Sequence, residues 1–194
     1  MLLIFFLLLT AIVPSLEAKI TLPPQVSIET LEVGPCLKFY LRIEDDDYIC
    51  VIHRKYFSRS YELVDDEGNL QSVAILDPDP EAPRFNVLDE EGGSLGAIQE
   101  MPYTFIPTFH FLSPQGDTLI IAESNFWQTE FSLIDPFTDT VIGLMTRSFF
   151  RLDDGWTLDL PDPAAFPLDH RLLASFLAIR SDPDLDEMKT PAAN

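Results

Sequence analysis

The chain has 194 residues, of which 46% are hydrophobic and 11% are aromatic, and its formal net charge is −20 at pH 7. This apolar content is enough to fill the core of one domain, so the composition excludes a wholly disordered chain. The negative charge excludes general electrostatic binding to nucleic acid, to other polyanions and to anionic lipid, because each of these needs a positive protein surface.

An apolar run of twelve residues, Leu2 to Val13, opens the chain. The run is too short to span a bilayer comfortably, and its length is typical of the apolar region of a signal peptide. Cleavage after Ser15 or after Ala18 suits the small residues that follow. We therefore predict a signal peptide over residues 1–18 and a secreted, cell-envelope or periplasmic protein. Because no Lys or Arg precedes the run, a membrane anchor formed by residues 2–13 is the alternative.

Residues 19–36 follow as a predicted N-terminal extension, and the two cysteines of the chain, Cys36 and Cys50, stand at and after its end. In an oxidising compartment the two thiols can pair and close a loop of about fifteen residues, which stabilises a fold by roughly 3 kcal/mol. Two buried thiols on neighbouring strands are the alternative.

A folded domain is predicted over residues 37–181, and it begins with two strands, over 37–43 and 48–53. An internal repeat follows, in which aromatic residues that open a strand and glycines that lie in a turn both recur every 24 residues. The aromatic residues are Tyr61, Phe85 and Phe109, and the glycines are Gly68, Gly92 and Gly116. Each unit consists of an alternating strand, a turn rich in acidic residues, Gly or Pro, and a second short strand, which is typical of a β-hairpin.

The repeat predicts four consecutive hairpins, and one further strand follows over 156–160. Segments with aromatic residues connect most of the hairpins, among them Tyr103-Thr104-Phe105 and Phe126-Trp127. The connector over 77–83 has three prolines, which cannot donate to a ladder, so it is predicted to be an exposed loop or a sheet edge. The total is about eleven or twelve strands.

The last predicted element is a helix over 169–181, with Asp169 as its cap. From Leu172 to Ile179 only Ser175 is polar, so the helix is apolar nearly all round and must be buried on every side. An antiparallel sheet that closes around such a helix hides its apolar face and loses both edges. The predicted fold is therefore mainly β, an antiparallel barrel built from hairpins around a central helix. A helix packed on one sheet face is the alternative, and residues 182–194 are predicted to be an acidic flexible tail.

Hairpin repeats followed by one apolar helix resemble the tubby C-terminal-like superfamily, which includes the tubby domain, phospholipid scramblases and the LURP-one-related proteins. The chain is most similar to the LURP-one-related group, in which a basic-basic-x-aromatic-Ser segment precedes an aromatic strand and an acidic-Gly turn. The matching segments here are Arg54-Lys55-Tyr56-Phe57-Ser58, after a strand that opens at Tyr48, and Tyr61 to Gly68. The resemblance covers roughly residues 37–181.

Tubby domains bind phosphoinositide headgroups through a basic pocket. The resemblance therefore implies an anion or lipid contact at the local basic cluster of Arg54, Lys55 and Arg59, beside His53. The alternative is that these are ordinary turn charges that balance neighbouring acidic residues.

The sequence contains no G-x-S-x-G elbow, no Gly-rich phosphate-binding loop and no C-x-x-C pair. The three histidines, His53, His110 and His170, lack metal-ligand spacing. The acidic series of Asp182, Asp184 and Asp186 matches only the first half of a calcium-binding loop. We therefore predict no catalytic residue, no metal and no cofactor.

The functional hypothesis is a non-enzymatic, exported binding or structural module that contacts a protein or a small amphiphile through its barrel surface or mouth. The alternative is a protein that binds phospholipid or acyl chains at a membrane surface. A hydrolase built from scattered carboxylates, such as Asp89 and Asp153, has no motif behind it.

Overall fold

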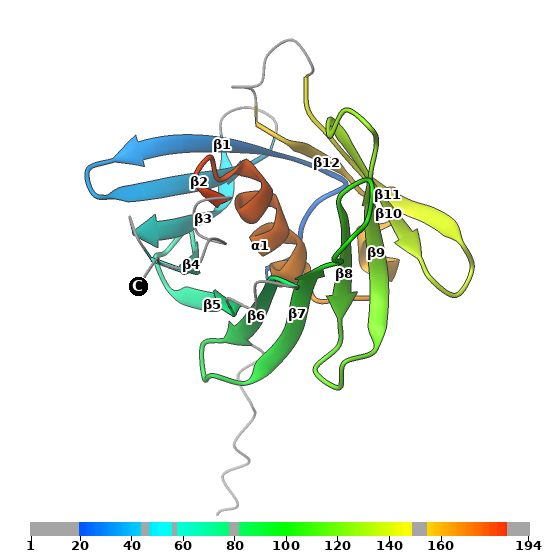
Figure 1. Cartoon of the computed structure of the whole chain (residues 1–194). Coiled ribbons are helices and arrows are strands. Elements are labelled where there is room, and N and C mark those ends of the chain that lie inside the picture. The colour runs from blue at the N-terminus through cyan, green and yellow to red at the C-terminus, as the bar shows by residue number, and fades with distance from the viewer. Residues whose placement is uncertain (1–19, 44–46, 56–57, 78–81, 149–154, 186–194) are drawn as a thin grey trace, which may run out of the picture.

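The computed structural model describes residues 20–43, 47–55, 58–77, 82–148 and 155–185. Within these ranges twelve strands pair antiparallel in chain order, and β1 pairs with β12 to close a barrel (Figure 1). The strands are β1 (Gln25–Val33), β2 (Cys36–Arg42), β3 (Tyr48–Lys55), β4 (Ser60–Asp65), β5 (Leu70–Asp77), β6 (Arg84–Asp89), β7 (Ser94–Glu100), β8 (Thr108–Leu112), β9 (Thr118–Ser124), β10 (Glu130–Asp135), β11 (Thr140–Thr146) and β12 (Thr157–Asp159). The prediction of an antiparallel barrel of eleven or twelve strands is confirmed.

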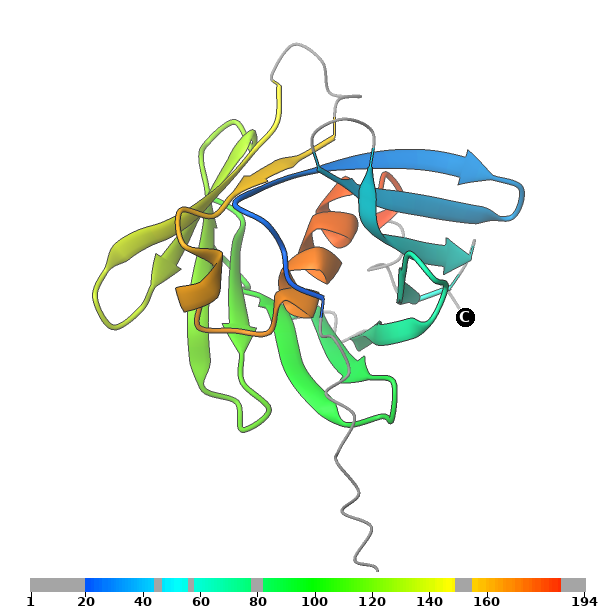
Figure 2. The same ribbon diagram turned by 180° about the vertical axis from the view of Figure 1, so that it is seen from behind.

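The helix α1 (His170–Ser181) lies inside the ring of strands, as Figures 1 and 2 show from opposite sides. Every residue from His170 to Ile179 is buried, and the helix contacts β1, β2, β4, β5 and β7. The Asp169 carboxylate accepts a hydrogen bond from the Arg171 amide at 3.0 Å and so caps the first turn. The prediction of a helix buried by the barrel is confirmed, and the alternative of a helix on one face of an open sheet is wrong.

The core is organised around Phe176 of α1. Its ring centroid lies 5.2 Å from that of Phe109, 5.1 Å from that of Phe111 and 5.5 Å from that of Phe131. These edge-to-face pairs add about 0.5–1.5 kcal/mol each beyond the area that they bury. Alternate residues of the strands point inward and complete the packing. Side chains therefore fill the space around the helix.

The 24-residue repeat has the same local structure in each hairpin. Gly68, Gly92 and Gly116 have φ angles of +88°, +85° and +94°, a left-handed conformation that favours Gly. The side chain that opens each turn accepts a hydrogen bond from an amide further along it: Asp65 from Asn69, Asp89 from Gly93, Ser113 from Asp117 and Asp135 from Phe137. The four predicted hairpins, β4–β5, β6–β7, β8–β9 and β10–β11, are confirmed.

The barrel has two different ends, because successive strands run in opposite directions. The four repeated turns lie at one end, which we call the hairpin end. The segments that join β3 to β4, β5 to β6, β7 to β8 and β9 to β10 lie at the other, the connector end. The helix begins at the hairpin end, where Arg171 donates to the Gln71 carbonyl at 2.8 Å, and it finishes at the connector end.

The predicted N-terminal extension over 19–36 is wrong, because β1 lies within it and closes the barrel. Val26 and Ile28 of this strand are buried, as are Ile20 and Leu22 before it. The Leu22 amide also donates to Nδ1 of His170 at 2.8 Å, which fixes the segment to the start of the helix. The alternation that marks a strand changes phase within β1, since its last apolar residues are exposed, and this weakened the sequence signal.

The predicted acidic tail over 182–194 is also wrong at its start. Asp182 and Leu185 are 6% and 4% exposed and belong to the barrel core. Residues 186–194 and the predicted signal peptide over 1–18 lie outside the described residues. Among the helices that the structure describes, none has the length and apolarity needed to cross a membrane.

Candidate functional site

Arg54, the first residue of the predicted basic cluster, is a buried structural residue that holds the end of the helix. Its side chain is 1% exposed, and its Nε pairs with Asp182 while a terminal nitrogen lies 2.6 Å from Oδ2 of Asp184. Tyr61 donates its hydroxyl to Oδ2 of Asp182 at 2.7 Å, the same oxygen that pairs with the Arg54 Nε. Burial lowers the pKa of Arg54, but the hydrogen bond to Asp184 and the charge of Asp182 outweigh it, so the net shift is upward.

The other two members of the predicted cluster do not join Arg54 in one pocket. Lys55 is exposed, because neighbouring residues of a strand point to opposite faces and Arg54 points inward. Arg59 is half-buried in the β3–β4 connector, where its carbonyl accepts the Leu76 amide at 2.8 Å. An anion contact at Lys55 and Arg59 stays a prediction, whereas the Arg54 guanidinium already has carboxylate partners.

The predicted disulfide between Cys36 and Cys50 is absent, because both thiols are free. Cys36 opposes Lys55 in the β2–β3 pairing, whereas Cys50 opposes Leu41, five residues further along β2. That separation is about 16 Å along the strand, and a disulfide needs Cα atoms within about 7 Å. Cys50 is buried, and burial raises the pKa of its thiol to about 12.

The remaining candidates for metal or catalytic chemistry that lie within the described residues have structural partners. Within the described residues, no cluster of three or more His, Cys, Asp or Glu side chains could hold a metal ion. Asp182 and Asp184 of the calcium-loop series bind Arg54, and Asp186 lies outside the described residues. Asp89 caps its own hairpin turn through the Gly93 amide at 2.6 Å, and Asp153 also lies outside the described residues.

Four aromatic side chains form an exposed surface at the connector end, which we call the connector patch. Tyr103 and Phe105 come from the β7–β8 connector and are 93% and 89% exposed, while Phe126 and Trp127 come from the β9–β10 connector and are 63% and 64% exposed. The rings of Phe105 and Phe126 stack at 6.1 Å, and those of Phe126 and Trp127 meet edge to face at 5.1 Å. Three of the rings, those of Phe105, Phe126 and Trp127, therefore form one continuous surface across the two connectors, and Tyr103 is exposed in the first of them.

Backbone geometry helps to form the connector patch. Tyr103 and Gln128 have φ angles of +61° and +53°, which a residue with a side chain rarely adopts. The Arg147 Nε donates to the Gln128 carbonyl at 3.1 Å, and its guanidinium carbon lies 4.7 Å from the centre of the Trp156 ring. The β9–β10 connector is therefore held against the barrel wall while its aromatic rings face outward.

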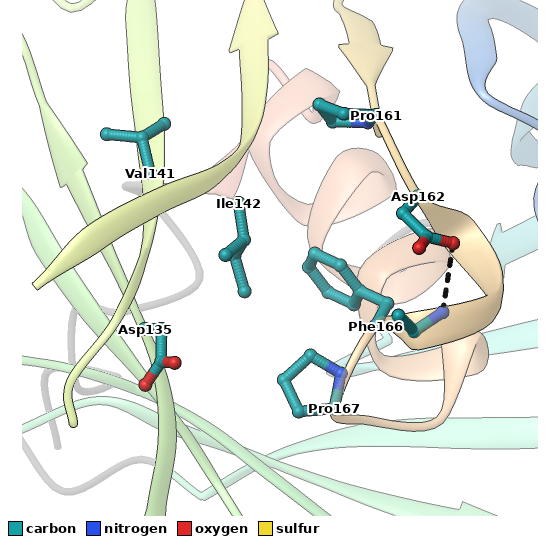
Figure 3. Close-up of a pocket in the computed structure, with 8 residues that line it drawn as sticks. Asp135, Val141, Ile142, Pro161, Asp162, Phe166 and Pro167 are labelled. Carbon is teal, nitrogen blue, oxygen red and sulfur yellow. Dashed lines mark hydrogen bonds between the residues drawn. The ribbon is translucent and has the colours of Figure 1, made fainter. Parts of the chain in front are cut away.

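A pocket of about 330 Å³ opens at the hairpin end, which we call the hairpin-end pocket (Figure 3). One wall comes from the β10–β11 hairpin and the other from the segment between β12 and α1, which contains the 3-10 helix η2 (Pro163–Ala165). The lining residues are Asp135, Val141, Ile142, Pro161, Asp162, Ala165, Phe166 and Pro167. The pocket is therefore apolar apart from two carboxylates.

Sequence reasoning identified the connector-patch aromatics as parts of connectors but did not assign them a function. The usable signal was the presence of large aromatic residues in segments where no strand pattern required them. The hairpin-end pocket was missed, because residues 161–167 were interpreted only as a break before the helix. No local pattern in the sequence places that break opposite the β10–β11 hairpin.

No protein-family model matches the chain, and no curated protein matches it in sequence. Among solved structures, the barrel is similar to the X-ray structure of the Arabidopsis thaliana protein AT5G01750, with a TM-score of 0.57 and 11% sequence identity. The match covers 88% of this chain and 95% of the Arabidopsis chain. At this identity the likeness concerns the fold, and it is compatible with a tubby-like barrel.

Proposed function

We propose that the chain is a non-enzymatic, exported binding module of the LURP-one-related, tubby-like class that holds a protein partner at the connector patch. The barrel shared with the Arabidopsis protein, which belongs to the LURP-one-related family, supports the class. The apolar run over residues 2–13, followed by small residues, supports export.

The observation that carries the protein-binding role is the exposure of four neighbouring aromatic side chains. Soluble proteins rarely leave large apolar side chains grouped in water unless the group is an interaction site. Aromatic residues also supply much of the free energy of binding in protein interfaces. Tyr103 has a left-handed backbone, which is strained for a residue with a side chain, and its side chain is 93% exposed. Burial of the Tyr103 ring within this chain therefore does not offset the strain.

The charge of the chain indicates the chemistry of the partner. Glu100 ends the strand before one aromatic connector, and Glu130 begins the strand after the other. Carboxylates at the rim and a net charge of −20 favour approach by a positive surface. We therefore expect a partner whose contact surface is apolar at its centre and basic at its rim.

The test compares two variants that remove exposed aromatic residues from opposite ends of the barrel. The full chain and its Phe105→Ser/Trp127→Ser variant are immobilised and exposed to an extract of the source organism. Retained proteins are then quantified by mass spectrometry at two salt concentrations. The control is Phe137→Ser, since Phe137 is 85% exposed in a turn at the hairpin end. We expect the double variant alone to lose the retained protein; equal retention by all three chains contradicts the proposal.

A second candidate function is phospholipid or acyl-chain binding at a membrane surface. It is favoured because Lys55, Arg59 and Arg147 lie at the same end of the barrel as the connector patch, and aromatic rings with nearby cations suit a membrane interface. Sedimentation with phosphatidylcholine vesicles, with and without phosphatidylserine, tests it. Binding that is lost in both Phe105→Ser/Trp127→Ser and Lys55→Glu/Arg59→Glu would favour the lipid role over the protein role.

A further inference from the structure

The hairpin-end pocket combines an apolar interior with carboxylates on opposite walls. Figure 3 shows the Ile142 and Phe166 side chains between the two walls, with Asp135 on the hairpin side and Asp162 on the side of the 3-10 helix. A volume of about 330 Å³ lies at the lower end of the range for small-molecule sites. The pocket therefore has the size and the lining of a site for a small ligand.

Both carboxylates are held in place by hydrogen bonds. Asp135 accepts the Phe137 amide at 2.8 Å and the Thr138 hydroxyl at 2.8 Å, and Asp162 accepts the Ala165 amide at 3.2 Å. The Phe137 amide, followed by the Thr138 hydroxyl, lowers the pKa of Asp135 and keeps its carboxylate ionised. These donors are neutral, so they orient the negative charges without cancelling them.

The segments around the pocket supply no compensating cation. Residues 130–146 and 159–169 contain no Lys or Arg, and neither Asp135 nor Asp162 forms an ion pair within the described residues. The same segments contain four further acidic residues, Glu130, Asp139, Asp159 and Asp169. Of these only Asp169 pairs with Arg171, so the local potential favours a positively charged ligand.

We propose that the hairpin-end pocket binds a small organic cation with an apolar body, such as an arylalkyl amine. The apolar body lies on Ile142, Phe166 and the flanking prolines, and the ammonium group lies at one of the two carboxylates, Asp135 on one wall or Asp162 on the other. This pocket is separate from the connector patch, so the inference stands whether or not a protein partner binds there.

The test uses three probes of nearly equal size that differ in charge: 4-phenylbutylammonium, 4-phenylbutanol and 4-phenylbutyrate. Binding to the full chain is followed by saturation-transfer NMR and by titration. Charge attraction near a protein surface predicts that the ammonium probe binds at least about tenfold more tightly than the alcohol and that the carboxylate probe binds least. Equal binding of all three, or binding of none, overturns the proposal.

Two variants locate the site, each with a matched control. Asp135→Asn/Asp162→Asn keeps the hydrogen-bond acceptors and should remove most of the preference for the ammonium probe. Asp139→Asn removes one charge from the same turn outside the pocket lining, and this variant should keep the preference for the ammonium probe. Val141→Lys places a cation at the pocket rim and should abolish binding, whereas Gln115→Lys adds the same charge at an exposed residue of another turn at the hairpin end, outside the pocket lining. Thermal unfolding checks that each variant is folded; loss of the preference in the controls as well overturns the site.

Discussion

The two ends of the barrel differ in how the chain closes them. At the hairpin end, each repeated turn is closed by its own hydrogen bonds, as when Asp89 accepts the Gly93 and Glu91 amides at 2.6 and 3.1 Å. At the connector end, the β9–β10 connector also has local hydrogen bonds, since Asn125 accepts the Thr129 amide at 2.9 Å. In addition it is held by a distant partner, Arg147, which donates to the Gln128 carbonyl at 3.1 Å. The hairpin turns repeat one pattern of hydrogen bonds, whereas the connectors differ from one another and carry large aromatic side chains that remain mostly exposed.

The ends also differ in charge. Acidic residues fill the turns at the hairpin end, as in Asp65 to Glu67 and Asp89 to Glu91, whereas Arg54, Lys55 and Arg59 lie at the connector end. The net charge of −20 is therefore unevenly distributed over the molecule. The connector end also carries Glu100 and Glu130, so its charges are mixed, whereas the turns of the hairpin end are mainly acidic.

The largest expected difference between the ends is in cysteine reactivity. Cys50 opposes Asp65 near the hairpin end, and burial raises its pKa to about 12, three units above the ordinary value of 9.0. Alkylation needs the thiolate, so Cys50 in the native protein should react about a thousandfold more slowly than an ordinary thiol. Mass spectrometry after iodoacetamide treatment at pH 8 should show label on Cys36, which is half-buried, and on Cys50 only after unfolding. Rapid native labelling of both, or an intact disulfide before treatment, would contradict the structure.

The next largest expected effect is on the free energy of unfolding, and it concerns two buried arginines. Arg54 lies at the connector end of α1, and Arg171 lies in the first turn of α1 at the hairpin end. Arg54→Met leaves Asp182 buried without its cation, which should lower the free energy of unfolding by about 3–5 kcal/mol. Arg171→Met at the hairpin end should cost less, about 1–2 kcal/mol, because its partners Asp169 and Glu90 are 17% and 35% exposed and can be hydrated. Urea denaturation measures both. The double variant Arg54→Met/Asp182→Leu should recover part of the loss, and equal costs for the two arginines would refute the comparison.

Substitutions of glycine by alanine should give smaller differences in stability between the two ends. Gly68→Ala and Gly116→Ala should each cost about 1 kcal/mol, because only the left-handed backbone disfavours Ala and no atom lies within 4 Å of the added Cβ. Gly155→Ala, before β12, should cost more, about 2–3 kcal/mol, because the added Cβ overlaps the Ile28 carbonyl. Thermal unfolding of the three variants should give two similar shifts and one larger shift; three equal shifts would show that the close packing at Gly155 relaxes freely.

The smallest expected effect on stability belongs to the connector patch. Phe105→Ser/Trp127→Ser should change the free energy of unfolding by less than about 0.5 kcal/mol, because side chains that are already in water lose little on truncation. Urea denaturation beside the wild-type chain checks this value. A loss above about 2 kcal/mol would mean that the two rings support the barrel rather than a partner.

Local patterns in the sequence predicted the parts of the molecule that local interactions stabilise. The 24-residue step through Tyr61, Phe85 and Phe109 identified the hairpins, because each turn satisfies its own backbone groups with nearby side chains. The apolar run from Leu172 to Ile179 identified the central helix, since a helix without a polar face has to be buried. Both patterns depend on neighbours in the chain and are visible in any short window.

Contacts between distant residues decided the rest. Nothing near Arg54 in the sequence indicates that Asp182, 128 residues later, will pair with it and turn an apparent surface cation into a buried one. The register of β2 and β3 separated Cys36 from Cys50, and the closure of β1 on β12 converted an apparent extension into a barrel strand. The sequence by itself thus determined the hairpins and the central helix, because these follow from periodicity and local hydrogen bonding, and the apolar helix indicated that the sheet surrounds it. Only the tertiary structure decided which charges are buried and which aromatic rings and pocket walls meet, because those outcomes depend on where the closed barrel brings remote segments together.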